Sequence, residues 1–254
     1  MFNYYKLLLN ATIYLKVNFI FMEIPKIIHQ VWSGSNGPLP EVLKEISQTW
    51  IKLHPKWEYQ FWDKDRMDNF VKRYYPEFFS IYNGYIYDVQ RWDVIRYLLL
   101  FKIGGVYVDF DYECLKSIED LIDGHSCCIG LDPDEHAKIF HKPYIISNAL
   151  MAIEAGHPFM KAVIQYLNNQ NVLAYDAIDQ FNYVLNTTGP YMLTRVYQSY
   201  KFKKQLYLVP SSMTSPLTKS EVGLLINEHI NPCVLDEKIK NAFAIHYFFG
   251  SWYK

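Results

Sequence analysis

The sequence has no excess of charge of either sign, which excludes one large class of partners. Its 254 residues include 25 Lys and Arg against 26 Asp and Glu, and the formal net charge is -1. Proteins that bind polynucleotides usually gather Lys and Arg into a basic surface. We therefore expect no nucleic-acid partner.

Cysteine is also scarce, and the spacing of the four that occur argues against two classes of small protein. Cys114, Cys127, Cys128 and Cys233 show neither the paired spacing of a zinc site nor the density of a secreted disulfide scaffold. We expect them to be reduced, buried thiols of a cytosolic protein.

Long apolar runs are missing too, and their absence bears on the amino terminus. Residues 2–21 are rich in Leu, Ile, Phe and Tyr but are interrupted by polar residues that include Lys6 and Lys16. No run approaches the ~18 to 20 apolar residues that span a bilayer, and no small-residue cleavage site follows. Two interpretations of residues 1–22 stay open: a helix on a membrane surface, or a true start at Met22.

Aromatic residues, by contrast, are plentiful. The chain has 22 Tyr, 16 Phe and 6 Trp, which amount to 17% of its residues. Flat aromatic faces suit sugar rings and nucleobases, although a tyrosine-rich core would give the same composition. Half of the residues are apolar, so residues 23–254 can bury the core of one large α/β domain.

The first part of this domain has the order of a β-α-β unit. Residues 26–32 and 57–62 are rich in β-branched and aromatic side chains, which predicts two strands. Between them, residues 40–53 place apolar side chains at helical spacing. This order favours a parallel sheet with helices packed on it.

A strongly apolar helix is predicted over residues 88–102, ended by Gly104 and Gly105. Residues 106–111 then form a strand whose end carries two acids. The remaining expectations are a strand over 127–131, a loop over 132–143, helices near 147–156 and 158–168, and short strand-like pieces from residue 207 onward.

The two acids, Asp109 and Asp111, are candidates for a metal site. On a strand, residues two apart point to the same face, so both carboxylates can reach one point. Mg²⁺ and Mn²⁺ prefer oxygen ligands, commonly one or two carboxylates together with substrate phosphates. An Asp-x-Asp pair by itself is also found at solvated strand ends, so its context matters.

That context is the preceding helix, where Asp93 and Arg96 lie about one turn apart and share a face. A surface ion pair is the simpler explanation. However, the neighbouring residues are mostly apolar, and charges on such an element usually line a site or are paired. We therefore favour a site in which these two side chains bind hydroxyl or phosphate groups.

Two runs carry a resemblance to a known family. Residues 91–97 read RWDVIRY and residues 104–111 read GGVYVDFD, and together they resemble glycosyltransferase family 32. This family includes bacterial capsular and lipopolysaccharide sugar transferases and yeast α-1,6-mannosyltransferases, and it shares its core with clostridial glucosylating toxins. Further similar motifs lie at residues 24–32, 148–158, 188–190 and 246–252, so the resemblance covers nearly all of the chain after the amino-terminal segment.

The resemblance implies a GT-A fold, an α/β class in which one Rossmann-like domain surrounds a mixed, mainly parallel sheet. It also implies transfer of a hexose from a UDP- or GDP-sugar with retention of anomeric configuration, and Mn²⁺ or Mg²⁺ as cofactor. The acceptor would be a glycan or lipid-linked glycan of surface polysaccharide, as in capsule or lipopolysaccharide synthesis. From this context we expect a cytoplasmic enzyme that can associate peripherally with the inner face of the cytoplasmic membrane.

The matched motifs also imply residue roles. Trp32 would stack on the nucleobase, and Asp93 with Arg96 would hold the donor sugar. Asp109 would bridge ribose and sugar and contribute to the metal site, and Asp111 would ligate the metal most directly. Apart from Trp32, these residues form the expected catalytic set.

The later motifs complete the expected site. His246 is a candidate metal or phosphate ligand, with a structural role as the open alternative. Ser251 and Trp252 would close over the diphosphate. Asn148 is counted with the donor site and, together with the loop over 132–141, is a candidate for shaping the acceptor side, although the acids of that loop are better explained as a solvated turn.

Two departures and two alternatives remain. Trp92 replaces the small or polar residue common in this motif and would reshape the sugar pocket, and Phe110 is bulky but should point to the opposite face from the two acids. No residue of the sequence is recognisable as a nucleophile, so we favour front-face attack.

The competing functions are an Asp-x-Asp phosphotransferase and a non-catalytic carbohydrate- or nucleotide-binding module.

Overall fold

A six-stranded sheet organises the fold, in the order β2-β1-β3-β6-β5-β7. β6 runs antiparallel to both of its neighbours, and the other adjacent strands pair in parallel. The predicted α/β class with a mixed, mainly parallel sheet is therefore confirmed. The strands are β1 (Ile27–Val31), β2 (Glu58–Trp62), β3 (Gly105–Val108), β5 (Cys127–Leu131), β6 (Ile146–Ile153) and β7 (Tyr207–Val209).

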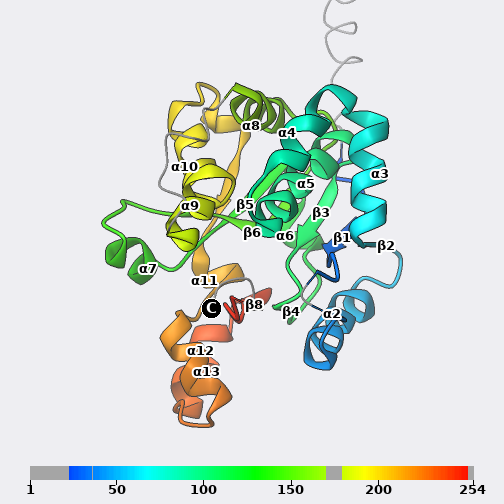
Figure 1. Ribbon diagram of the computed structural model, residues 1–254. Coiled ribbons are helices and arrows are strands. Elements are labelled where there is room, and N and C mark those ends of the chain that lie inside the picture. The colour runs from blue at the N-terminus through cyan, green and yellow to red at the C-terminus, as the bar shows by residue number, and fades with distance from the viewer. Residues whose placement is uncertain (1–22, 36, 170–178, 251–254) are drawn as a thin grey trace, which may run out of the picture.

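The computed structural model describes residues 23–35, 37–169 and 179–250 (Figure 1). The predictions for residues 1–22, Ser251 and Trp252 fall outside these ranges. The helices of four residues or more are α2 (Glu41–Leu53), α3 (Lys64–Tyr74), α4 (Phe79–Gly84), α5 (Asp88–Lys102), α6 (Glu119–Ile122), α7 (Asp134–Ile139), α8 (Pro158–Asn169), α9 (Gln180–Thr187), α10 (Pro190–Ser199), α11 (Ser211–Thr214), α12 (Lys219–Ile226) and α13 (Pro232–Ile239).

Both faces of the sheet are buried, by different sets of helices. Tyr107 of β3 packs in the large core that includes α3, α5, α8 and α10. Its neighbours Val106 and Val108 belong to a second core on the other face, together with Trp50 of α2. The period-two alternation of a strand thus divides one short segment between two cores.

The connection from α5 to β3 requires glycine. Gly104 and Gly105 have φ values of +75° and +103°. A Cβ atom on Gly104 would lie 2.6 Å from the backbone nitrogen of Ala155, and one on Gly105 would lie 2.6 Å from the carbonyl oxygen of Ile27. Only glycine fits both the backbone angles and the close approach, so this pair fixes β3 against the end of α5.

Three predictions of local structure are wrong. The loop expected over residues 132–143 contains the helix α7. The helix expected near residues 147–156 is the strand β6, all eight residues of which are buried. A strand buried on both faces has no polar alternation, so its sequence resembles that of a buried helix. The tail after residue 207 also contains α11, α12 and α13 in addition to strands, and Figure 1 shows these three helices grouped beside β8 (Ala244–His246).

The cysteines are free thiols, and three of the four, Cys114, Cys127 and Cys128, are buried as predicted. Cys233 is exposed, which corrects the prediction for that residue. Of the helices within the three described ranges, none has the length and apolarity needed to cross a membrane.

His29, which is fully buried in β1, predicts a pH dependence of stability. Its Nε2 donates to the carbonyl of Gly104 at 2.9 Å, and its Nδ1 accepts from Trp62 Nε1 at 3.2 Å, so the ring is neutral. Burial lowers its pKa to about 4 from 6.5. The unfolded chain therefore takes up the proton first, and up to about 3 kcal/mol of stability is lost as pH falls from 6.5 to 4.

Urea unfolding of wild type and His29→Gln between pH 8 and pH 4 tests this expectation. The substitution should cost about 1–2 kcal/mol at pH 8, and this difference should shrink as the pH falls. The matched control is exposed His229→Gln, which should leave the pH profile unchanged. Parallel profiles for wild type and His29→Gln would contradict the account.

Candidate active site

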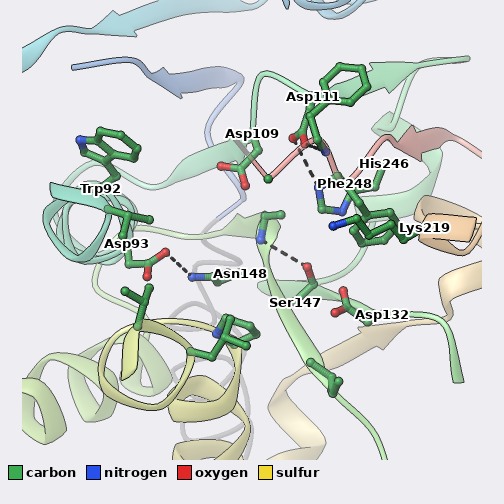
Figure 2. Close-up of a pocket in the computed structure, with 18 of the residues that line it drawn as sticks. Trp92, Asp93, Asp109, Asp111, Asp132, Ser147, Asn148, Lys219, His246 and Phe248 are labelled. Carbon is green, nitrogen blue, oxygen red and sulfur yellow. Dashed lines mark hydrogen bonds and ion pairs between the residues drawn. The ribbon is translucent and has the colours of Figure 1, made fainter. Parts of the chain in front are cut away.

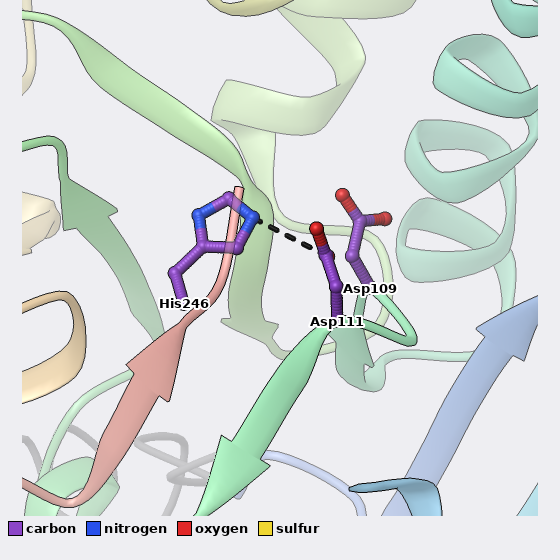
Figure 3. A group of neighbouring side chains, drawn as sticks. All are labelled: Asp109, Asp111 and His246. Atoms are coloured by element: carbon purple, nitrogen blue, oxygen red, sulfur yellow. Dashed lines mark ion pairs between the residues drawn. The ribbon is translucent and has the colours of Figure 1, made fainter. Parts of the chain in front are cut away.

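Asp109 and Asp111 lie in the turn between β3 and β4 (Tyr112–Cys114), not on the strand itself. The strand ends at Val108, and the backbone N–H of Tyr112 donates to the carbonyl of Asp109 at 3.2 Å. The two acids do converge, as predicted, but a turn rather than strand alternation brings them together. Figure 3 shows both side chains on the same side of this turn, facing His246.

His246 reaches the two acids through a small second sheet in which β4 pairs with β8, and Tyr112 lies opposite His246. The imidazole stacks on the Tyr112 ring with centroids 4.3 Å apart, and its Nε2 lies 3.4 Å from Asp111 Oδ1. Phe249 N–H donates to Asp111 Oδ2 at 2.9 Å. Two residues near the carboxyl terminus, His246 and Phe249, thus contact the Asp111 carboxylate.

The group formed by Asp109, Asp111 and His246 has the composition and spacing of a divalent-metal site. Each residue offers a ligand atom, and the three atoms lie within 4.8 Å of one another. Two carboxylates and one imidazole suit Mn²⁺ or Mg²⁺, and the imidazole favours Mn²⁺. Nε2 is the His246 atom directed at the acids. Nδ1, on the other side of the ring, is buried and has no hydrogen-bond partner.

The electrostatics of these three residues are unequal. Burial raises the pKa of Asp109 above its usual value, although the nearby Arg96 opposes the shift. Burial acts in the same sense on Asp111, but the charge and hydrogen bond of His246 outweigh it and lower the pKa of Asp111. In return, Asp111 outweighs the effect of burial on His246 and raises the pKa of the imidazole. Asp111 is therefore the acid that stays ionised.

Arg96 connects this group to α5. Its Nη1 lies 3.2 Å from Asp109 Oδ1, and its Nη2 lies 3.1 Å from Asp93 Oδ1. The guanidinium carbon also lies 4.5 Å from the centroid of the Tyr107 ring. The Asp93 and Arg96 side chains are each only 6% exposed, which excludes the simpler interpretation of a surface ion pair.

Asp93 is held by two further side chains. Its Oδ1 accepts from Asn148 Nδ2 at 2.9 Å, and its Oδ2 accepts from Thr188 Oγ1 at 2.8 Å. Burial raises the pKa of Asp93 to about 6, even though Arg96 and these hydrogen bonds favour the charged form. Asn148 comes from β6 and Thr188 from the end of α9, so residues distant in the sequence fix one carboxylate.

These residues surround a cavity of about 630 Å³, part of which is drawn in Figure 2. Every predicted site residue within the described ranges lines it: Trp32, Asp93, Arg96, Asp109, Asp111, Asn148 and His246. Among the residues that the structure describes, five carboxylates but only two permanent cations, Arg96 and Lys219, line the same cavity. The cavity is therefore acidic.

Aromatic side chains form part of the cavity wall. Trp32 lines the cavity with its ring edge toward Phe110, at a centroid distance of 6.2 Å, and its Nε1 donates to the carbonyl of Gly37 at 3.0 Å. Phe110 also lines the cavity and packs against Leu43 and Ile46 of α2. Trp92 lines the cavity beside Asp93, and its effect on a sugar pocket stays a prediction.

Asp132 is a cavity residue that sequence reasoning weighed but assigned instead to a solvated turn. Its carboxylate lines the cavity, and Oδ1 is buried without a hydrogen-bond partner, which corrects the interpretation of this acid as part of a solvated turn. Asp134 and Glu135 are exposed, as that interpretation expected. Ser147, Lys219 and Phe248 also line the cavity, and no local motif marks them.

Comparison with known proteins identifies the family. Residues 40–128 match the profile described as the glycosyltransferase sugar-binding region containing the DXD motif. Inositol phosphoceramide mannosyltransferase 3 of Schizosaccharomyces pombe is 32% identical over 178 residues, which cover 70% of this chain and 46% of that protein. Mannosyl phosphorylinositol ceramide synthase SUR1 of Saccharomyces cerevisiae is 32% identical over 180 residues, covering 70% and 43%.

The chain belongs to the DXD glycosyltransferase family. It spans about half the length of the curated relatives that it matches. Among solved structures, the UDP-bound glycosyltransferase domain from the YGT toxin has a TM-score of 0.53 at 10% identity, covering 85% of this chain and 89% of that one. This likeness supports the GT-A fold, and the predicted family and fold are confirmed.

The predicted location is wrong. A cytoplasmic enzyme at the inner face of the cytoplasmic membrane was inferred from bacterial surface-glycan assembly. Relatives that match this DXD glycosyltransferase over most of its length include instead yeast proteins named for inositol phosphoceramide or phosphorylinositol ceramide. Membership of a family that also includes bacterial enzymes therefore does not predict the cellular compartment of this protein.

The ion-pair network predicts a large loss of stability on removal of its centre. Arg96→Met should lower the free energy of unfolding by about 3–5 kcal/mol, because the buried Asp93 and the partly buried Asp109 would lose their cation. Exposed Arg73→Met is the control and should change stability by less than about 0.5 kcal/mol. Equal unfolding midpoints in urea for the two variants would contradict a structural role for Arg96.

Proposed function

We propose that this chain is a metal-dependent, retaining glycosyltransferase that moves a hexose from a UDP- or GDP-sugar to a hydroxyl group of a glycan or lipid acceptor, and that residues 23–254 act as one GT-A domain. The observation that carries the proposal is the convergence of Asp109, Asp111 and His246 at the edge of an acidic cavity. The family and fold support the same conclusion.

The charge of the cavity is the reason to expect a metal. A nucleoside diphosphate is an anion, and a cavity with five carboxylates and two permanent cations would repel it. Arg96 cannot compensate, since it is already paired with Asp93 and Asp109. Bound Mn²⁺ or Mg²⁺ would neutralise the departing diphosphate as a Lewis acid, and Asp109, Asp111 and His246 would hold the ion.

The other residues position the donor. Trp32, Asp93 and Arg96 all line the cavity. Trp32 would stack on the nucleobase, and the Asp93–Arg96 pair would bind sugar hydroxyls. Asp93 and Asp109 are each engaged by Arg96 and by further hydrogen bonds. Such carboxylates are better placed to bind hydroxyl groups than to act as nucleophiles, which favours front-face attack with the enzyme supplying position and electrostatics.

The names of the relatives guide the choice of substrates. Because they are mannosyltransferases of inositol phosphoceramide, GDP-mannose is the first donor to test, and an acceptor with a polyol head and a lipid tail is the first acceptor. Surface polysaccharide remains the second acceptor class, as the family resemblance implies.

Donor turnover tests the proposal. Purified protein should hydrolyse one donor from a panel of UDP- and GDP-sugars with Mn²⁺, and EDTA should abolish the reaction. Asp111→Asn should lower kcat/KM by at least about 100-fold, whereas exposed Asp123→Asn should stay within about twofold. A folded protein with no turnover, but with nucleotide- or sugar-dependent stabilisation, would favour the binding-module alternative.

Removal of the expected stacking surface gives a separate prediction. Trp32→Ala should raise the donor KM by about tenfold or more, because stacking of a base on an aromatic ring contributes about 1–3 kcal/mol. Trp32→Phe should retain most of the affinity. An unchanged donor KM in Trp32→Ala would show that the base binds elsewhere.

A further inference from the structure

Two cavity carboxylates, Asp132 and the exposed Glu135, are not used by the donor mechanism, and Asp132 is the less exposed of the two. It follows β5 directly, lines the cavity, and its Oδ1 is buried without a hydrogen-bond partner. Figure 2 shows Asp132 beside Ser147, on the opposite side of the view from Asp93. A buried carboxylate oxygen without a partner is costly, so a ligand that donates a hydrogen bond there would remove the cost.

The chemistry around Asp132 argues against the diphosphate as that ligand. A carboxylate repels phosphate oxygens but accepts well from a hydroxyl group. The neighbouring His136 accepts the backbone N–H of Lys219 at its Nε2, at 3.0 Å, so the neutral ring carries its proton on Nδ1. The charges of His246 and His136 act on Asp132. Glu135, which precedes His136 on α7, acts on His136.

An apolar surface continues from this carboxylate along the end of α7. Ile139 and Phe140 are 68% and 38% exposed, and both line the cavity. Phe140 lies 6.1 Å from Phe181 and 5.7 Å from Tyr191, measured between ring centroids, and both of these rings also line the cavity. One edge of the cavity therefore offers a polar anchor followed by exposed apolar side chains.

We propose that Asp132 and the end of α7 form the acceptor subsite, and that the acceptor is an amphipathic polyol. Asp132 accepts a hydrogen bond from an acceptor hydroxyl, and Ile139 with Phe140 contacts the apolar chain attached to that head. The inference rests on the proposed function, which it deepens by assigning the acceptor to particular residues. Burial also raises the pKa of Asp132 above its usual value, although His246, His136 and a hydrogen bond with the Ser147 side chain oppose the shift.

The experiment compares transfer with hydrolysis in the full-length protein. The acceptors are dodecyl α-mannoside and phosphatidylinositol, each paired with its chainless head, methyl α-mannoside and myo-inositol. Hydrolysis and transfer use the same bound donor, so their ratio reports on the acceptor alone. The variants are Asp132→Asn, the matched control Asp134→Asn, which changes an exposed acid two residues away, and the double variant Ile139→Ser/Phe140→Ser.

We expect Asp132→Asn to raise the acceptor KM and to lower the ratio of transfer to hydrolysis by about tenfold or more, because a charge-assisted hydrogen bond is lost. Asp134→Asn should keep the wild-type ratio. The double variant should lower kcat/KM by about tenfold for the chain-bearing acceptors alone. The melting temperature of Asp132→Asn should equal or exceed that of wild type, since the charge is removed from a carboxylate whose buried Oδ1 has no hydrogen-bond partner, whereas a structural role would lower it.

Several outcomes would overturn the inference. Equal losses of transfer and hydrolysis, or a raised donor KM, would assign Asp132 to the donor side. Donor hydrolysis without transfer to any of the four acceptors, or equal use of chain-bearing and chainless heads, would exclude an amphipathic polyol. Absence of donor turnover in wild type would instead remove the proposed function, and this inference with it.

Discussion

The buried Arg96, placed between Asp93 and Asp109, is the interaction on which the rest of the site depends. It joins the middle of α5 to the turn after β3, and its Nη1 also donates to the carbonyl of Asn148 on β6 at 3.0 Å. Burial of three charges is expensive unless each is paired and hydrogen-bonded. Asn148 and Thr188 supply the remaining partners of Asp93, so sheet, helix and loop are fixed together.

This arrangement has a direct chemical consequence. Because Arg96 is engaged with Asp93 and Asp109, Asp111 pairs instead with His246 and accepts the backbone N–H of Phe249. The cavity stays acidic as a whole, which suits a divalent cation and disfavours a bare diphosphate. Its polar groups then divide into a donor end around Asp93 and Asp111 and, by our proposal, an acceptor end around Asp132.

Much of this could be predicted from sequence where the signal is local. The β1-α2-β2 unit and the bounds of α5 follow from apolar periodicity and from Gly104, and the Asp-x-Asp pair is visible in its motif. β6 was mistaken for a helix because a strand buried on both faces shows no alternation. The place of Asp132 in the cavity and the hydrogen bond from Thr188 to Asp93 could not be predicted, because only tertiary packing produces them and no spacing along the chain records that packing.

The central claim is that a divalent cation is required for this acidic cavity to accept a nucleoside diphosphate. Isothermal titration calorimetry with GDP and with UDP, first with Mn²⁺ and then with EDTA, tests it most directly. The account predicts that one nucleotide binds with Mn²⁺ and that its affinity falls at least about 100-fold in EDTA. Equal affinity in both conditions would show that the cation is dispensable and would contradict the account.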